Sequence, residues 1–111
     1  MSALYAMRYA GQADVGAGVL FIGKGVIVGA DIGNLRYKGT YVESGGRIKG
    51  TAAMSAPPQG GRLVTGVAMS AGSTIQVTVD WPSDFANGQA QQIMVAGRPV
   101  QVTFEKIGDV P

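Results

Sequence analysis

Hydrophobic residues recur at every second position along this chain, and not at the three- and four-residue spacing of an amphipathic helix. Near the N-terminus, Tyr5, Met7 and Tyr9 alternate with Ala6 and Arg8. Alternation of this kind is typical of a β-strand with one face against a core, because successive side chains of a strand point to opposite faces. The first ten residues therefore predict a strand.

Two β-hairpins are predicted in the first half of the chain. Residues 17–22 and 26–31 are apolar runs separated by a glycine-containing turn. Residues 35–41 and 47–54 alternate cleanly on either side of a second glycine-containing turn. Short turns between such runs are the sequence signature of antiparallel hairpins.

The second half of the chain predicts further strands at residues 62–69, 75–81 and 100–105, and Pro82 ends the middle one. Residues 93–96 are apolar but few, so they leave the expected number of strands at eight or nine. No segment carries a convincing helical pattern.

A chain of 111 residues has the size of one domain, here residues 1–111. Strands joined by short turns favour an up-and-down antiparallel meander, and closure of the sheet removes its exposed edges. The expected fold is therefore all-β, a small closed up-and-down antiparallel barrel. Eight strands leave an interior just wide enough for side chains or for one small ligand.

The outer face of the hairpin at residues 35–54 carries a candidate basic patch: Arg36, Lys38, Arg47 and Lys49. If Val42 pairs with Arg47 across the turn, Gly39 faces Gly50, and paired glycines suit a bend or the close approach of another backbone. A solvated polar face is the more usual explanation of these charges, and an acidic partner is the alternative.

The sequence lacks the residues that most enzymes and metal sites use. It contains no cysteine and no histidine, which excludes disulfides, thiolate sites and imidazole bases. Asp80 and Asp84 flank Trp81 and Pro82, but two acids beside a proline turn are more often turn and capping residues than a catalytic pair. We expect no enzyme activity, no catalytic or metal-binding residue and no cofactor.

Composition also bears on location and on large partners. No run approaches the ~18 apolar residues of a membrane-spanning helix, and Arg8 interrupts the only early apolar run, so neither a membrane span nor a signal peptide is expected. The absence of cysteine is compatible with a reducing compartment, and we expect a cytoplasmic protein. The net charge is only +2, and Tyr37 and Tyr41 face away from the basic patch, so no direct nucleic-acid binding is expected.

The inward face of the expected barrel is rich in aromatic, methionine and branched side chains. A packed core is the more usual outcome for such a face, and a ligand cavity of roughly 300 Å³ or more is the alternative. The residues that would line this cavity are Tyr5, Met7, Tyr37, Tyr41, Ile48, Met54, Ile75, Val77 and Phe104.

The order of motifs in the first half, at residues 4–9, 16–20, 25–31 and 37–41, resembles the GrlR family, negative regulators of bacterial type III secretion. The motifs are a tyrosine strand, a Gly-x-Gly strand, a strand that ends in Gly-x-Asp, and Tyr-x-Gly. The resemblance implies an eight-stranded lipocalin-like barrel that forms a homodimer and represses by binding a transcriptional activator. In that family an acidic turn after the fourth strand makes the contact. The matching residues here are Glu43, Ser44, Gly45 and Gly46, of which only the first is acidic.

Two functions follow as hypotheses. The first is a non-enzymatic regulator that acts by binding another protein, itself a homodimer. Residues 19–22 and 26–30 support self-association, because they are apolar on both faces and a barrel interior covers only one. The alternative is a binder of a small apolar molecule or lipid that uses the barrel interior.

Overall fold

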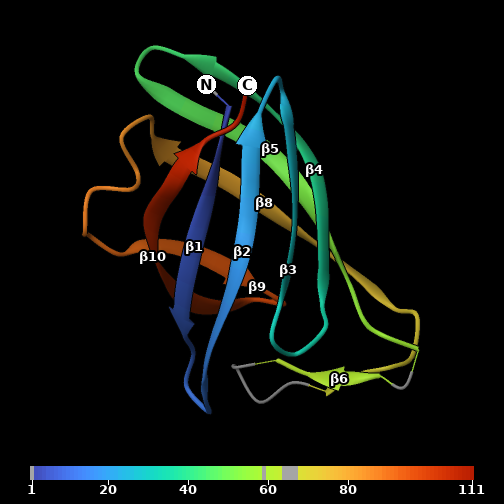
Figure 1. The fold of residues 1–111 in the computed structure, drawn as a ribbon. Helices are drawn as coiled ribbons and strands as arrows, with labels where there is room; N and C mark the ends of the chain where they lie inside the picture. The colour runs from blue at the N-terminus through green and yellow to red at the C-terminus, as the bar shows by residue number, and fades with distance from the viewer. Residues whose placement is uncertain (1, 59, 64–67) are drawn as a thin grey trace.

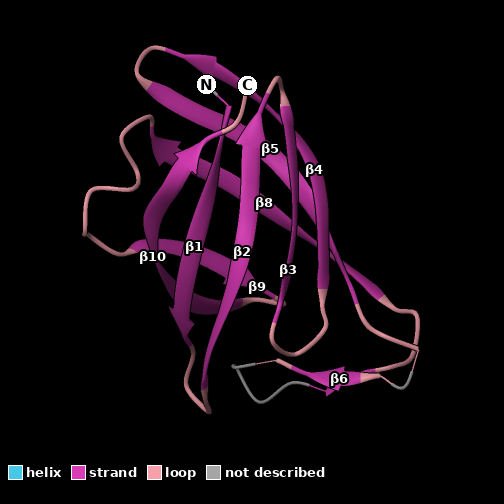
Figure 2. Cartoon of the chain, viewed as in Figure 1, coloured by secondary structure: helices cyan, strands magenta, loops and turns pink. Residues whose placement is uncertain are grey.

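The computed structural model describes residues 2–58, 60–63 and 68–111, and the only regular elements in these residues are strands, joined by loops (Figure 2). In chain order the strands are β1 (Ser2–Ala10), β2 (Val15–Gly23), β3 (Val26–Asp31), β4 (Arg36–Ser44), β5 (Arg47–Ser55), β6 (Gly61–Arg62), β7 (Ala68–Met69), β8 (Thr74–Pro82), β9 (Gln91–Val95) and β10 (Arg98–Asp109).

Eight of these strands form one antiparallel sheet with the order β8-β5-β4-β3-β2-β1-β10-β9. From β1 to β5 consecutive strands pair with each other, β5 pairs with β8, β9 pairs with β10, and β10 returns to lie beside β1 (Figure 1). The ends of the sheet, β8 and β9, are fully described and lie against each other without a shared ladder. The predicted up-and-down barrel is therefore confirmed, and it is nearly closed.

The single strand predicted at residues 62–69 is wrong. β6 and β7 pair with each other outside the eight-stranded sheet, and residues 64–67 lie outside the described part of the chain. Pro57 and Pro58 precede β6, and proline has no N–H group to continue a ladder. β8 pairs with β5 instead, and the short run at residues 93–96 supplies the eighth barrel strand as β9.

The expected pairing between β4 and β5 is also corrected. Gly45 and Gly46 take φ values of 61° and 77° and form a two-residue turn. Ser44 therefore pairs with Arg47 across this turn. Gly39 then lies opposite Ala52 and not opposite Gly50. The displacement is by two residues, so every side chain stays on its predicted face.

Glycines on the inward face allow the sheet to curve into a barrel. Four of them lie on the neighbouring strands β2, β3, β4 and β5: Gly18, Gly29, Gly39 and Gly50. Each glycine lies two residues along its strand from the residue that pairs with the preceding glycine, so the four form a diagonal across the sheet. A Cβ atom at Gly39 would lie 2.1 Å from the carbonyl oxygen of Thr51, and one at Gly50 would lie 2.0 Å from that of Thr40. The neighbouring backbones therefore approach along this diagonal because side chains are missing there.

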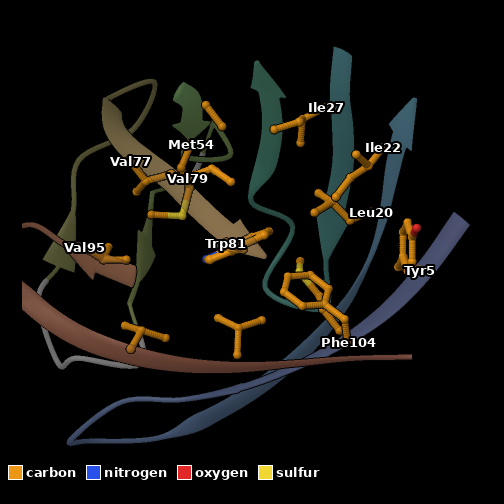
Figure 3. Packing of buried hydrophobic residues seen from close by; sticks show 14 of the residues in the cluster. Tyr5, Leu20, Ile22, Ile27, Met54, Val77, Val79, Trp81, Val95 and Phe104 are labelled. Carbon is orange, nitrogen blue, oxygen red and sulfur yellow. The ribbon is translucent and has the colours of Figure 1, made fainter. Parts of the chain in front are cut away.

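A cluster of aromatic rings fills one part of the barrel interior. Phe85, in the loop between β8 and β9, is only 1% exposed, and its ring centroid lies 4.8 Å from that of Tyr5 and 5.1 Å from that of Phe104. Trp81 packs on Phe104, with their ring centroids 4.8 Å apart (Figure 3). This cluster separates the packed half of the interior from the half that is open.

Candidate functional site

The open half of the barrel contains a cavity of about 290 Å³. All eight barrel strands contribute inward side chains to its wall, which are mostly aliphatic or aromatic. The cavity extends from Trp81 and Phe104 to the loops that join β1 to β2 and β3 to β4, where exposed Val15 and Ile32 form its rim. Leu63, next to β6, covers the same end.

The predicted lining residues divide between this cavity and the packed core. Met7, Tyr37, Met54, Val77 and Phe104 line the cavity. The others lie elsewhere, and all of them except the partly buried Ile75 are buried: Tyr5, Tyr41, Ile48 and Ile75. Alternation places all nine on the inward face, but it does not tell at which height along the axis the aromatic cluster fills the interior.

One polar cluster interrupts the apolar wall. The hydroxyl groups of Tyr9 on β1 and Tyr37 on β4 both donate hydrogen bonds to Oδ2 of Asp31, at 2.6 Å and 2.5 Å. Oδ1 of Asp31 accepts the backbone N–H groups of Gly33 and Leu35 at 2.9 Å and 3.1 Å. The carboxylate therefore has four donors, which fills its usual acceptor capacity.

The local sequence explains how this cluster assembles. Asp31 ends β3, and its carboxylate closes the loop to β4 in the manner of an Asx turn, helped by the left-handed conformation of Asn34 (φ 64°). Gly16 lies opposite Tyr9, and a Cβ atom there would come within 2.5 Å of the tyrosine ring. The glycine thus leaves room for the ring to lie over the strand and reach Asp31.

Burial and the hydrogen bond to Asp31 raise the pKa of the Tyr9 hydroxyl and, more strongly, the pKa of the Tyr37 hydroxyl. Both groups are therefore protonated at neutral pH, and both protons are engaged by the carboxylate. Only the lone pairs of the phenolic oxygens remain for a molecule in the cavity. No lysine or arginine lines the cavity within the described residues, so the site favours a hydrogen-bond donor and disfavours an anion.

Two further residues with polar side-chain atoms line the cavity, exposed Asp14 and buried Trp81. The side chain of Trp81 is 4% exposed, and its indole Nε1 has no hydrogen-bond partner among the described residues. Sequence reasoning did not single out Trp81 or Asp31 as site residues. The alternation that found Val77 also places Trp81 on the inward face, so its signal was present in the sequence.

The candidate basic patch lies on the outside of the barrel, away from the cavity. Arg36, Lys38, Arg47 and Lys49 are all exposed, as predicted. The corrected pairing places Lys49 opposite Val42, four residues from Lys38, so the patch is spread along the hairpin.

Part of the patch is already neutralised. Arg47 Nε lies 2.7 Å from Oδ1 of Asp80, and its hydrogen bond is the main cause of the lowered pKa of that carboxyl group. Lys49 is the cross-strand neighbour of Asp80. The charges of Arg47 and Lys49 therefore have an acid beside them on β8.

The candidate partner-binding turn is short and fully exposed. Glu43 and Ser44 end β4, and Gly45 and Gly46 form the turn. The N–H group of Ser83 donates to the carbonyl oxygen of Gly46 at 2.8 Å. The turn thus packs against the end of β8 and is not part of the cavity wall.

A second exposed feature is apolar. Val19, Val26 and Val28 point outward from β2 and β3 and are well exposed. They continue a surface of small and apolar side chains across three strands, which we call the outer apolar face: Leu4, Ala6, Val19, Phe21, Val26, Val28 and Ala30.

Within the described residues, no three acidic side chains are grouped so as to hold a metal ion, and no helix could cross a membrane. The known protein-family models and the curated protein sequences contain no match to this chain. The cavity and the exposed surface are therefore the features that bear on its function.

Proposed function

We propose that this protein is a non-enzymatic carrier or sensor that holds one small, mainly apolar molecule inside its barrel. The observation that carries the proposal is the cavity of about 290 Å³, with a mostly apolar wall and a hydrogen-bonded polar corner formed by Tyr9, Asp31 and Tyr37. Concave apolar sites with a few convergent polar groups are the usual form of small-molecule sites.

The size and charge of the cavity limit the ligand. At the ~30 Å³ that each water occupies in the liquid, the cavity holds roughly ten non-hydrogen atoms. The negative charge of Asp31 and the absence of a cationic side chain from the described wall favour a neutral or positively charged molecule. Fatty-acid carboxylates are therefore poor candidates, because their charge would be buried without a partner.

Toluene tests this proposal, since engineered apolar cavities of ~150 Å³ bind benzene. We expect saturable shifts of the methyl resonances of Leu20, Val77 and Val95 in NMR spectra, with those of outward Val42 unchanged. Val77→Phe fills the cavity and should weaken toluene binding at least about tenfold. Val42→Phe, the same change at an outward site, should not alter it. Absence of saturable shifts at the wall, or shifts confined to the outer surface, would refute the proposal.

A second candidate is the regulatory role expected from the resemblance, in which the protein acts by binding other protein chains. The outer apolar face favours it, because contiguous exposed apolar surface marks interaction sites on folded domains. We propose that a second copy of this chain covers that face. The charges that flank this face support the choice, because Arg36 and Lys38 lie on its β4 side and Glu105 lies on its β10 side.

A further inference from the structure

We infer that the cavity binds a small protonated amine, whose apolar body fills the interior and whose ammonium group lies at the mouth. The carboxylates of Asp14 and Asp31 attract the ammonium group there, and the phenolic oxygens of Tyr9 and Tyr37 accept its N–H groups. This inference rests on the proposed ligand-binding function and names the class of its ligand.

The first argument is the charge of the mouth. Asp14, in the loop between β1 and β2, and Asp31, at the end of β3, both line the cavity. Each is followed directly in the sequence by one of the exposed rim residues, Val15 and Ile32. No lysine or arginine lines the cavity within the described residues. A concave site whose charges have one sign attracts ligands of the opposite sign, so this mouth favours a cation.

The second argument is the hydrogen-bonding character of the polar corner. Tyr9 and Tyr37 line the cavity and are only partly buried, and both donate their hydroxyl protons to Oδ2 of Asp31. Their oxygens therefore keep only lone pairs, and because they share one carboxylate oxygen they lie close together. Donation to a charged group also strengthens an oxygen as an acceptor. An ammonium group carries several N–H donors and no acceptor, so it matches this pair better than a hydroxyl group.

The third argument is that the negative end of the cavity is also the end open to water. Burial of an ammonium ion in an apolar interior is costly. Asp14, Val15 and Ile32 are exposed, so a charged group beside them keeps part of its hydration. The inner wall includes buried Val79 and Phe104. The cavity therefore has the same polarity as an amine with a hydrocarbon body.

Two probes of equal size test the inference. Cyclohexylamine and cyclohexanol have the same ring and the same number of non-hydrogen atoms, but only the amine is positively charged at neutral pH. We expect NMR titrations of the wild-type protein at low ionic strength to give about fivefold tighter binding of the amine. Differences in cavity shape affect both probes alike, so this preference reports the ammonium group.

Asp14→Asn removes one of the two charges and keeps the side-chain oxygen that accepts the N–H group of Val15. It should lower the preference for the amine about twofold. Asp84→Asn is the matched control, because Asp84 is exposed in the loop after β8 and does not line the cavity. We expect this control to leave the preference unchanged.

The orientation of the bound amine gives a second measurement, which needs only the wild-type protein. We expect nuclear Overhauser effects from the ring proton next to nitrogen to the rings of Tyr9 and Tyr37. The opposite side of the cyclohexyl ring should give effects to Val79 and Phe104. The reversed pattern would overturn the inference, because the ammonium group would then lie away from the mouth.

A preference near one in the wild-type protein, or equal preferences in Asp14→Asn and Asp84→Asn, would also overturn it. Toluene separates this failure from that of the proposed function. If toluene binds inside the cavity while the amine has no advantage over the alcohol, the ligand class is wrong and the binding function stands. If none of the three probes binds there, the proposed function fails and the inference fails with it.

Discussion

Asp31 joins three strands and a loop through one carboxyl group. It ends β3, accepts hydroxyl groups from Tyr9 on β1 and Tyr37 on β4, and closes the loop to β4 through two backbone N–H groups. Bonds to a charged acceptor are about twice as strong as neutral ones. The cluster therefore fixes the rim of the cavity and places a carboxylate in its wall, in addition to exposed Asp14.

The raised pKa of Tyr37 makes a prediction for alkaline solution. Its contribution to stability is complete below the unfolded pKa of about 10 and is lost above it, because the unfolded tyrosine ionises and the folded one resists. Above about pH 10, the free energy of unfolding should therefore fall by up to about 1.4 kcal/mol per pH unit from this group. Tyr37→Phe should cost about 1–2 kcal/mol at neutral pH, and this difference should shrink as the pH rises. Urea titrations followed by Trp81 fluorescence measure it, and a difference independent of pH would contradict the assignment.

Sequence patterns predict part of this cluster. Alternation places Tyr9 and Tyr37 on the inward face, and both are found there. Asp31 follows an apolar strand and precedes a glycine, which indicates a turn residue and gives no sign of two tyrosine partners. Their meeting depends on the pairing of β1, β2, β3 and β4, which a single sequence does not encode locally.

At the scale of elements, the glycine diagonal explains how alternating strands become a barrel. Alternation fixes which face of a strand is buried, but a displacement by two residues leaves the faces unchanged, and this is why the expected pairing of β4 with β5 was wrong while its faces were right. The two-residue turn at Gly45 and Gly46 sets the true pairing. Both glycines still allow the close backbone approach that was predicted, but Gly39 lies against Thr51 and Gly50 lies against Thr40.

Gly39→Ala tests this role of the diagonal. The new Cβ would lie 2.1 Å from the backbone carbonyl oxygen of Thr51, which cannot move without displacing β5. We expect a loss of about 1–3 kcal/mol in the free energy of unfolding, by urea denaturation, although alanine is intrinsically preferred to glycine in a strand. Gly108→Ala is the matched control, since a Cβ on that strand residue meets nothing within 4 Å. Equal stability of the two variants would show that curvature does not depend on Gly39.

At the scale of the whole molecule, barrel closure was predictable and the position of the cavity was not. Alternating hydrophobic positions and glycine turns predict the up-and-down order and eight or nine strands, although the expected strand at residues 62–69 is not part of the barrel. The division of the interior depends on Phe85, which comes from a loop and packs on Tyr5 and Phe104. Its sequence neighbourhood, 84–88, carries only turn signals, so nothing local indicates that this ring enters the core.

Charged residues of opposite sign flank the two sides of the outer apolar face, and this arrangement suits a two-fold dimer. On the β4 side, Arg36 and Lys38 flank the outer apolar face, and on the β10 side Glu105 lies opposite Ala6. A two-fold axis parallel to the strands, in the plane between two such faces, places the β4 side of one protomer against the β10 side of its partner. Glu105 of each protomer then meets Arg36 and Lys38 of the other, so that the apolar centres pack and the flanking charges attract twice.

Val28→Glu tests this dimer within the outer apolar face. Val28 is 48% exposed and lies opposite Lys38, so glutamate is compatible with the folded monomer, but in the dimer its charge would be buried against the apolar face of the partner. We expect the wild-type protein to sediment as a dimer at concentrations on the order of 10 μM, and Val28→Glu as a monomer with an unchanged toluene affinity. Val42→Glu is the matched control, because Val42 is 66% exposed and lies opposite Lys49 but outside the face. A wild-type monomer, or equal dissociation by both variants, would show that the outer apolar face is not the self-association surface.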